Sequence, residues 1–230
     1  MRIAKYIADS GLCSRREAER WIEDGRVEVD GEILASPALN VEENNLVKVD
    51  GKLISAAPPP KLWVYYKPLG LITTHDDPQG RPTIFEQLKK LPRVISVGRL
   101  DINSEGILLL TNNGELSRYL EKPSNKVERV YKVRVYGRGR EIDIENKKII
   151  AEGVTYHPKS IKLTQKKGAN SWYEVILTEG KNREIRKIFE YFGFEVSRLI
   201  RTSYGKYKLN HMKPGEFSEV KIDENYSWKA

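Results

Sequence analysis

The sequence predicts an α+β protein built from two domains, and three observations point to this organisation. Residues 56–60 read Ala-Ala-Pro-Pro-Pro, which can neither continue a helix nor pair inside a sheet. Two short helical patterns and a few short alternating runs precede this segment, whereas strand patterns dominate after it. The two parts also carry opposite net charge. We therefore predict a first domain over residues 1–55, a linker over residues 56–60 and a second domain over residues 61–230.

Two helices and a few short strands are expected in the first domain. Apolar residues at positions 3, 4, 7 and 8 define a helix that stops at Gly11. Ser14-Arg15-Arg16-Glu17 forms a capping box for a second helix, which ends at Gly25 and directs Arg15, Arg16 and Arg20 largely away from its apolar stripe. The runs 26–29 and 47–49 alternate, and each is closed by an Asp-Gly pair, which is a strong turn signal.

The second domain is expected to contain a mainly antiparallel mixed sheet. Residues 63–66 run into a turn at 67–70, residues 107–111 read as a buried strand, and residues 130–136 alternate strictly. This alternation places Tyr131, Val133 and Val135 on one face of their strand. The remaining expected elements are a short helix capped by Thr83, a helix between the Asn113-Gly114 turn and Pro123, a helix capped by Asn182 and stopped by Gly193, and a short final strand region from Ser203.

Composition and charge indicate a globular protein whose partner is a polyanion. The 230 residues are 39% hydrophobic and 31% charged, with a net charge of +8. Residues 1–60 carry 8 Lys/Arg against 11 Asp/Glu, so the remaining residues, with 32 against 21, hold a net charge of +11. Within residues 181–208, eight Lys/Arg accompany three Glu, a stronger bias than a solvated surface normally shows. We predict a nucleic acid as the partner.

Several classes of protein are disfavoured by the same sequence. No apolar run approaches the ~20 residues that span a bilayer, and the N-terminus lacks a signal-peptide pattern. The single cysteine, Cys13, cannot form an internal disulfide and fits the cytoplasm, where we expect it to pack among apolar residues. His75, His157 and His211 lack the spacing of a zinc site. Phosphate-binding glycine loops, dinucleotide fingerprints and a Ser/His/Asp set are not found.

Asp101 is the strongest candidate for a reacting group. It lies in the stretch Gly98-Arg99-Leu100-Asp101, directly before the apolar run that starts at Ile107. An aspartate beside an arginine, at a glycine-flanked junction between a loop and a strand, is kept ionised and reachable, as a carboxylate nucleophile must be. An ordinary turn aspartate that bonds its own backbone would look the same in this stretch.

Several motifs together resemble the bacterial ribosomal RNA pseudouridine synthases, most closely the RsuA/RluB group. They are Lys67-Pro68-Leu69-Gly70, Gly98-Arg99-Leu100-Asp101, the strand with Tyr131, and Glu179-Gly180-Lys181-Asn182-Arg183-Glu184-Ile185-Arg186, in this order and spacing. Residues 1 to about 55 are similar to the alpha-L RNA-binding fold, which is named after the fourth small-subunit ribosomal protein. The resemblance covers nearly the entire chain and implies a small RNA-binding domain followed by a synthase domain.

The resemblance assigns chemistry to four residues. Asp101 corresponds to the nucleophilic aspartate, which attacks the target uridine at C1′ of the sugar or at C6 of the base. Arg186 corresponds to the basic residue that pairs with this carboxylate and keeps it ionised in a dry pocket. Tyr131 corresponds to the tyrosine that stacks on the base, and Leu199 to an apolar residue of the pocket. Since the reaction is an isomerisation, no cofactor or metal is implied. Alternatively, Arg186 faces solvent, and Tyr131 and Leu199 only pack in the core.

Contacts to RNA are expected from both domains. Arg99 resembles the residue that enters the RNA stack when the target nucleotide is flipped out, although it would equally serve to orient its own turn. The other expected phosphate contacts are Lys67, Lys181, Asn182 and Arg183 in the second domain, and Arg2, Lys5, Arg15, Arg16 and Arg20 in the first. The acidic balance of the first domain leaves its share of the affinity open.

The predicted function is therefore the conversion of a uridine to pseudouridine in ribosomal RNA. The sequences of residues 197–201 and 182–184 resemble the RluB side of the group, which favours large-subunit (23S) RNA over small-subunit (16S) RNA. The substrate is either naked RNA or an assembly particle. The rival from another class is a non-catalytic RNA-binding factor of ribosome assembly. We expect a cytoplasmic monomer without a membrane partner.

Overall fold

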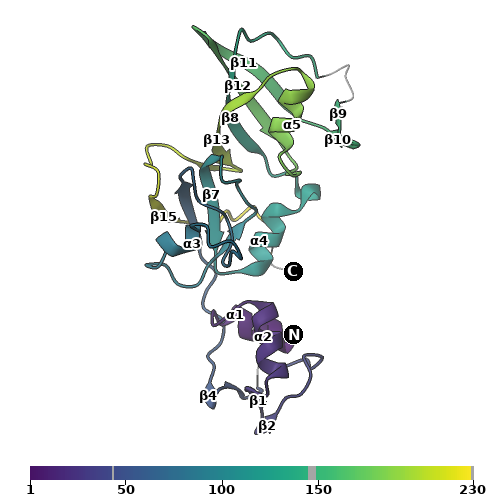
Figure 1. Cartoon of the computed structure of the whole chain (residues 1–230). Helices are drawn as coiled ribbons and strands as arrows, with labels where there is room; N and C mark the ends of the chain where they lie inside the picture. Colours follow the sequence, from purple (N-terminus) through teal and green to yellow (C-terminus); the bar gives the residue numbers. More distant parts are fainter. Residues whose placement is uncertain (43, 145–148, 229–230) are drawn as a thin grey trace. The chain divides into compact units, whose positions relative to one another are not determined.

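A computed structural model of the chain describes residues 1–42, 44–144 and 149–228 (Figure 1). These residues divide into two units, which are described separately. The first unit comprises Met1–Lys61 with Leu91–Ile95 and Asn112–Gly114, and the second comprises Leu62–Lys90, Ser96–Thr111 and Glu115–Ala230. None of the helices in the described ranges has the length and apolar character that crossing a lipid bilayer requires.

The first unit packs two helices on a four-stranded sheet. The helices are α1 (Ile3–Asp9) and α2 (Arg15–Glu23), and the strands, in the order β2-β1-β3-β4, are β1 (Val27–Val29), β2 (Glu32–Ile33), β3 (Val47–Val49) and β4 (Lys52–Leu53). The predicted helix start is confirmed, because the Ser14 hydroxyl accepts the Glu17 N–H at 3.2 Å. Both Asp-Gly turns are confirmed as hairpins. The core contains Ile3, Ile7 and Ile22, and Cys13 is buried within it, as predicted.

A long mixed sheet forms the second unit. Seven of its strands follow the order β11-β12-β8-β13-β7-β5-β15, with β14 beside β13 and β6 beside β7. The strands are β5 (Leu62–Lys67), β6 (Ile95–Val97), β7 (Glu105–Thr111), β8 (Arg129–Tyr136), β11 (Ser160–Lys167), β12 (Asn170–Leu177), β13 (Val196–Tyr204), β14 (Tyr207–Lys208) and β15 (Phe217–Val220). A separate hairpin contains β9 (Ile149–Ala151) and β10 (Val154–Tyr156). Five of the six pairs along the path are antiparallel, which confirms the predicted α+β class.

The one parallel pair on this path joins the two halves of the sheet. Strands β13 and β7 pair only through Ile200 with Glu105 and Arg201 with Gly106. Gly106 has φ +111°, and a Cβ atom built on it would lie 2.2 Å from the Arg201 carbonyl oxygen. Only a residue without a side chain permits this approach. The turn with Asp101 precedes β7, whereas Tyr131 and Leu199 lie on strands of the other half.

Helix α5 (Glu184–Tyr191) lies across β8, β12 and β13 in Figure 1. Its buried side includes the predicted apolar residues Ile185, Ile188 and Phe189, and Phe189 meets the Tyr173 ring edge-on at 5.0 Å between ring centroids. The prediction that Asn182 caps this helix is wrong. The N-cap residue is Arg183, whose φ of +50° is left-handed and whose side chain makes no capping bond.

Three further helical segments complete the second unit. They are α3 (Ile84–Gln87), α4 (Gly114–Glu121) and the 3₁₀ turn η1 (Pro123–Asn125). The predicted cap of α3 is confirmed, because the Thr83 hydroxyl accepts the Glu86 N–H at 3.3 Å. Proline at the start of η1 ends α4, as expected from Pro123. Residues 56–60, the predicted linker, form neither helix nor strand.

Candidate active site

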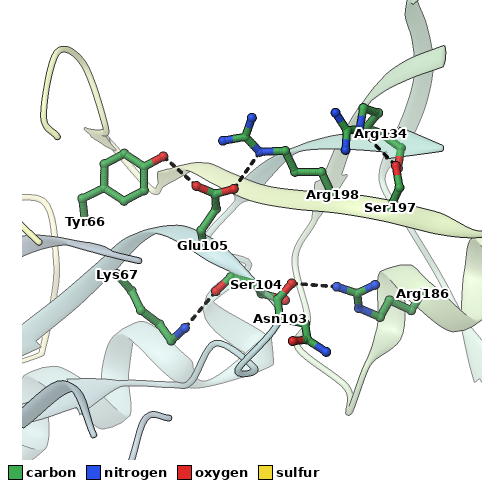
Figure 2. Close-up of polar contacts among 9 residues, drawn as sticks. All are labelled: Tyr66, Lys67, Asn103, Ser104, Glu105, Arg134, Arg186, Ser197 and Arg198. Carbon is green, nitrogen blue, oxygen red and sulfur yellow. Dashed lines mark hydrogen bonds and ion pairs between the residues drawn. The ribbon is translucent and has the colours of Figure 1, made fainter. Parts of the chain in front are cut away.

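Asp101 lies on the turn between β6 and β7, and hydrogen bonds hold every backbone carbonyl from residue 100 to residue 104. The acceptors and donors are Leu100 O with Thr73 Oγ1 (2.9 Å), Asp101 O with Ser104 N (3.0 Å), Ile102 O with Gly70 N (2.9 Å), Asn103 O with Arg186 Nη2 (2.8 Å) and Ser104 O with Lys67 Nζ (2.9 Å). Figure 2 shows the last two of these contacts on opposite sides of the turn. Most buried backbone groups are paired in this way, and here the five bonds hold the path of the turn. The Asp101 side chain remains 38% exposed.

Lys67 is entirely buried, and this corrects the expectation that it contacts a phosphate. Its side chain has no exposed surface, and its ammonium donates to the carbonyls of Pro68 and Ser104 at 2.9 Å each. Burial lowers the pKa of Lys67 to about 8, although the negative charges of Asp101 and Glu105 oppose the shift. Lys67 therefore stabilises the turn through its bonds to the Pro68 and Ser104 carbonyls. Its ammonium is not available to RNA in this fold.

A second buried charge lies at the start of β7. Glu105 accepts hydrogen bonds from Arg198 Nε at 2.7 Å and from the Tyr66 hydroxyl at 3.0 Å (Figure 2). Burial alone would raise the pKa of Glu105, but these two hydrogen bonds outweigh it and hold the pKa below its ordinary value. The ionised Glu105 thus links β5, β7 and β13 directly behind the turn.

The arginine nearest to Asp101 is Arg183. Its Nη1 lies 3.9 Å from Asp101 Oδ2, whereas Arg186 donates to the carbonyls of Val196 (3.0 Å) and Asn103 (2.8 Å). The prediction that Arg186 forms the ion pair with Asp101 is therefore wrong for this structure. Burial lowers the pKa of Arg186, Arg183 lowers it further, and Asp101 opposes both. Arg186 thus holds the turn through its hydrogen bond to the Asn103 carbonyl. It also adds positive potential beside the Asp101 carboxylate.

The four residues predicted to be catalytic line one pocket of about 510 Å³, together with Arg99, Lys181, Asn182 and Arg183. Such a volume is in the usual range of small-molecule sites. Tyr131 and Leu199 are 7% and 6% exposed, so both side chains are buried at the wall of the pocket. An ionisable carboxylate, an aromatic ring, an aliphatic side chain and several cations therefore converge on a space that admits a nucleobase.

Sequence reasoning missed several buried polar residues of this pocket. Arg129 and Arg201 are 5% and 3% exposed, and Arg129 donates to the Tyr204 hydroxyl at 2.8 Å. The Arg201 guanidinium carbon lies 6.0 Å from the Tyr131 ring centroid. A signal was present, because Arg129 falls on the same side of the alternating strand as Tyr131 and Val133. Glu184, 3% exposed, was missed as well.

The residues of the first domain that we expected to contact RNA all belong to the first structural unit. Arg15, Arg16 and Arg20 are exposed along α2, which agrees with their expected direction. Arg2 is exposed and donates from its guanidinium to the Ala38 carbonyl. Lys5 is half-buried and lies 4.0 Å from Asp9. Helix α2 therefore exposes three arginines, together with three glutamates.

Comparison with known proteins identifies the family. The family model described as RNA pseudouridylate synthase matches residues 61–191, more than half of the chain. The chain belongs to this family. A model of the S4 domain matches residues 1–47 of the synthase, and the resemblance to the RsuA/RluB group is confirmed by the relatives below.

Curated relatives cover nearly the whole synthase. It is 54% identical over 222 residues to an RNA pseudouridine synthase of Rickettsia felis, covering 95% of this chain and 96% of the relative. It is 42% identical over 239 residues to the ribosomal large subunit pseudouridine synthase B of Salmonella typhimurium, covering 98% and 81%. A crystal structure of a pseudouridylate synthase shares the fold, with a TM-score of 0.62, 24% identity and 96% of both chains covered. The synthase is thus an isomerase that acts on RNA.

Proposed function

We propose that the synthase converts a specific uridine of large-subunit (23S) ribosomal RNA into pseudouridine, with Asp101 as the nucleophile. The observation that carries this proposal is the Asp101 carboxylate on a fully bonded turn at the wall of a pocket that also contains Tyr131 and Leu199. The large-subunit target is supported by the 42% identity to the Salmonella typhimurium enzyme named for that subunit.

The proposed reaction exchanges one bond to the sugar for another. Asp101 attacks C1′ of the sugar or C6 of the base, the C1′–N1 bond breaks, and the base rotates. A C1′–C5 bond then forms and the bond between Asp101 and the nucleoside breaks, which returns the free carboxylate. C5 loses its proton and N1 gains one, so the product has the same atoms as the substrate and needs no cofactor. Arg183 and Arg186 place positive charge beside the Asp101 carboxylate, while Arg99 takes the place of the flipped nucleotide in the RNA stack.

We assign RNA binding outside the pocket to residues 1–55 and catalysis to residues 61–230, with residues 56–60 as the linker. The two family models, over residues 1–47 and 61–191, support this division. Arg2, Lys5, Arg15, Arg16 and Arg20 contribute phosphate contacts in the first domain, and Lys181, Asn182 and Arg183 do so at the pocket. The synthase acts as a cytoplasmic monomer in this proposal.

Mapping pseudouridines in ribosomal RNA from cells with and without the gene tests the target. We expect one site, or a small cluster, in 23S RNA to revert to uridine when the gene is deleted and to be restored by a plasmid copy. Purified synthase, offered 23S transcript and isolated large-subunit particles, then shows which form is modified. Loss of a 16S site instead would overturn the proposed target, and an unchanged map would favour a non-catalytic factor.

Tyr131 provides a test of the pocket itself. Because the ring is buried against the pocket, Tyr131→Phe should keep the rate within about tenfold if stacking dominates. Tyr131→Ala removes the ring, and we expect it to lower the rate about 100-fold because the base is no longer positioned. Tyr136→Ala, which alters an exposed ring on the same strand, is the matched control. Equal losses for Phe and Ala would instead assign the role to the hydroxyl.

A further inference from the structure

Two carboxyl groups, those of Glu179 and Glu184, lie close together where the chain enters α5. Glu184 is 3% exposed and lines the pocket. Its Oε2 accepts the Lys181 backbone N–H at 2.9 Å, whereas its Oε1 is buried without a hydrogen-bond donor from the described part of the chain. Glu179 lies within hydrogen-bonding range of Glu184. Both carboxyl groups are thus held by Lys181, Glu184 through the backbone N–H and Glu179 through the ammonium, and one oxygen of Glu184 lacks a donor.

The surrounding charges neutralise Glu179 and leave Glu184 without a cation. Lys181 Nζ is 2.7 Å from Glu179 Oε1 and also donates to the Thr155 carbonyl at 2.7 Å. The backbone N–H of His157 donates to the same Glu179 oxygen at 3.4 Å. A buried ionised carboxylate with an oxygen that lacks a donor is costly, so the state of lower free energy places a proton on Glu184. That proton converts Oε1 into a donor to Glu179 and satisfies both groups.

The electrostatics agree with this assignment. Burial, reinforced by the negative charge of Glu179, raises the pKa of Glu184 to about 7. Burial would also raise the pKa of Glu179, but hydrogen bonds from Lys181 and Glu184 outweigh it and lower that pKa. Other charged groups nearby serve other partners: Arg129 donates to the Thr178 carbonyl at 3.1 Å, and Lys187 pairs with Glu152 at 2.5 Å.

The same turn determines where Arg183 lies. The Glu184 N–H donates to the Lys181 carbonyl at 3.2 Å, and the Lys181 N–H donates back to the Glu184 side chain. These two bonds enclose Asn182 and Arg183. Arg183 adopts φ +50°, a conformation that side-chain-bearing residues rarely adopt unless their surroundings enforce it. Its guanidinium reaches to 3.9 Å from Asp101.

We propose that Glu179 and Glu184 hold one proton between them and form a positioning pair, which keeps Arg183 beside Asp101. When the proton is lost, the two carboxylates repel each other, the Glu184 bond to Lys181 is weakened, and Arg183 moves away from Asp101. The effect on the rate rests on the proposed role of Asp101 as the nucleophile. The shared proton itself does not.

Single-turnover rates across pH test the pair, with release of tritium from 23S transcript labelled at uridine C5 as the measurement. For the wild type we expect the rate to fall about tenfold per pH unit above the midpoint, as for loss of one required proton. Glu184→Gln carries a permanent donor to Glu179, so it should keep the rate seen at pH 6 and abolish this fall. Glu184→Ala should be slower than wild type at pH 6. Glu190→Gln, on the exposed side of α5, should retain the wild-type profile.

Unfolding free energy against pH provides a readout independent of Asp101. The pKa of Glu184 in the fold, about 7, exceeds its ordinary value of 4.5, so the folded state binds the proton more tightly. The contribution of Glu184 to stability is then greatest below pH 4.5 and declines as pH rises to about 7. Glu184→Gln should lack this decline.

The outcomes separate the two proposals. An alkaline fall in rate that persists in Glu184→Gln, or that disappears in His157→Gln, would overturn the positioning pair, as would an unchanged dependence of stability on pH. If Asp101→Asn still forms product while Glu184→Gln has lost the pH dependence of stability, the nucleophile assignment fails and the shared proton stands. Should Glu184→Ala not fold, the Gln variant alone decides.

Discussion

Asp101→Asn is expected to lower the rate of pseudouridine formation by more than about 10⁴-fold, because a nucleophile that cannot form the covalent bond leaves only binding and orientation. The amide has nearly the same shape as the carboxylate, and the Asp101 side chain is 38% exposed, so the fold is retained. Removing one negative charge beside Arg183 does not weaken attraction to a polyanion. Product formation and equilibrium binding of 23S transcript, measured on the same preparation, check both expectations.

A matched control for this variant is Asp76→Asn. Asp76 is an exposed aspartate of the same unit that does not line the pocket, and its loss should leave the rate unchanged. An Asp101→Asn enzyme with a rate near that of the Asp76→Asn enzyme would contradict the nucleophilic role. Loss of binding in parallel with loss of rate would instead indicate that Asp101 positions the RNA.

Lys67→Met should lower the rate about 100-fold, because the Ser104 and Pro68 carbonyls lose their donor and the turn with Asp101 shifts. Stability is the weaker readout. Removing a buried ammonium whose pKa is already depressed to about 8 relieves its desolvation, while two unpaired carbonyls cost about 1–3 kcal/mol each. These two contributions to the unfolding free energy have opposite signs and partly cancel. We therefore expect a large fall in rate and only a small change in stability.

Lys90→Met provides the comparison, because Lys90 is an exposed lysine of the second unit outside the pocket. Rates at saturating RNA and the affinity for RNA should both be measured. The buried position of Lys67 predicts a lower rate with unchanged affinity. A fall in affinity with an unchanged rate would mean that Lys67 reaches the RNA in the complex after all.

Local patterns predicted the elements that depend on local interactions. The capping residues Ser14 and Thr83 and the alternation of β8 were confirmed in the structure. The start of α5 was not, because the left-handed Arg183 depends on hydrogen bonds that Glu184 makes across the turn. Strands β9 to β12 and β15 were not predicted, although the burial of β12 alternates strictly.

The sequence motifs predicted which residues line the pocket. They did not predict which side chains contact each other there. Asp101 and Tyr131 were identified by family motifs, and both line the same space. We predicted Arg186 as the neighbour of Asp101, but the structure places Arg183 there. This depends on the left-handed backbone of Arg183 at the start of α5, and the spacing of motifs carries no information about that conformation. Lys67 was placed at the surface because lysines usually lie there, whereas every residue of its strand β5 is buried.

The narrow junction at Gly106 has a consequence for how this enzyme tolerates mutation. A single methyl group there would collide with the Arg201 backbone and separate the strands that bring the proposed nucleophile, Asp101, and the Tyr131 ring to one pocket. The alignment of the two halves of the pocket thus depends on a position that has no side chain. No other amino acid can replace glycine there conservatively.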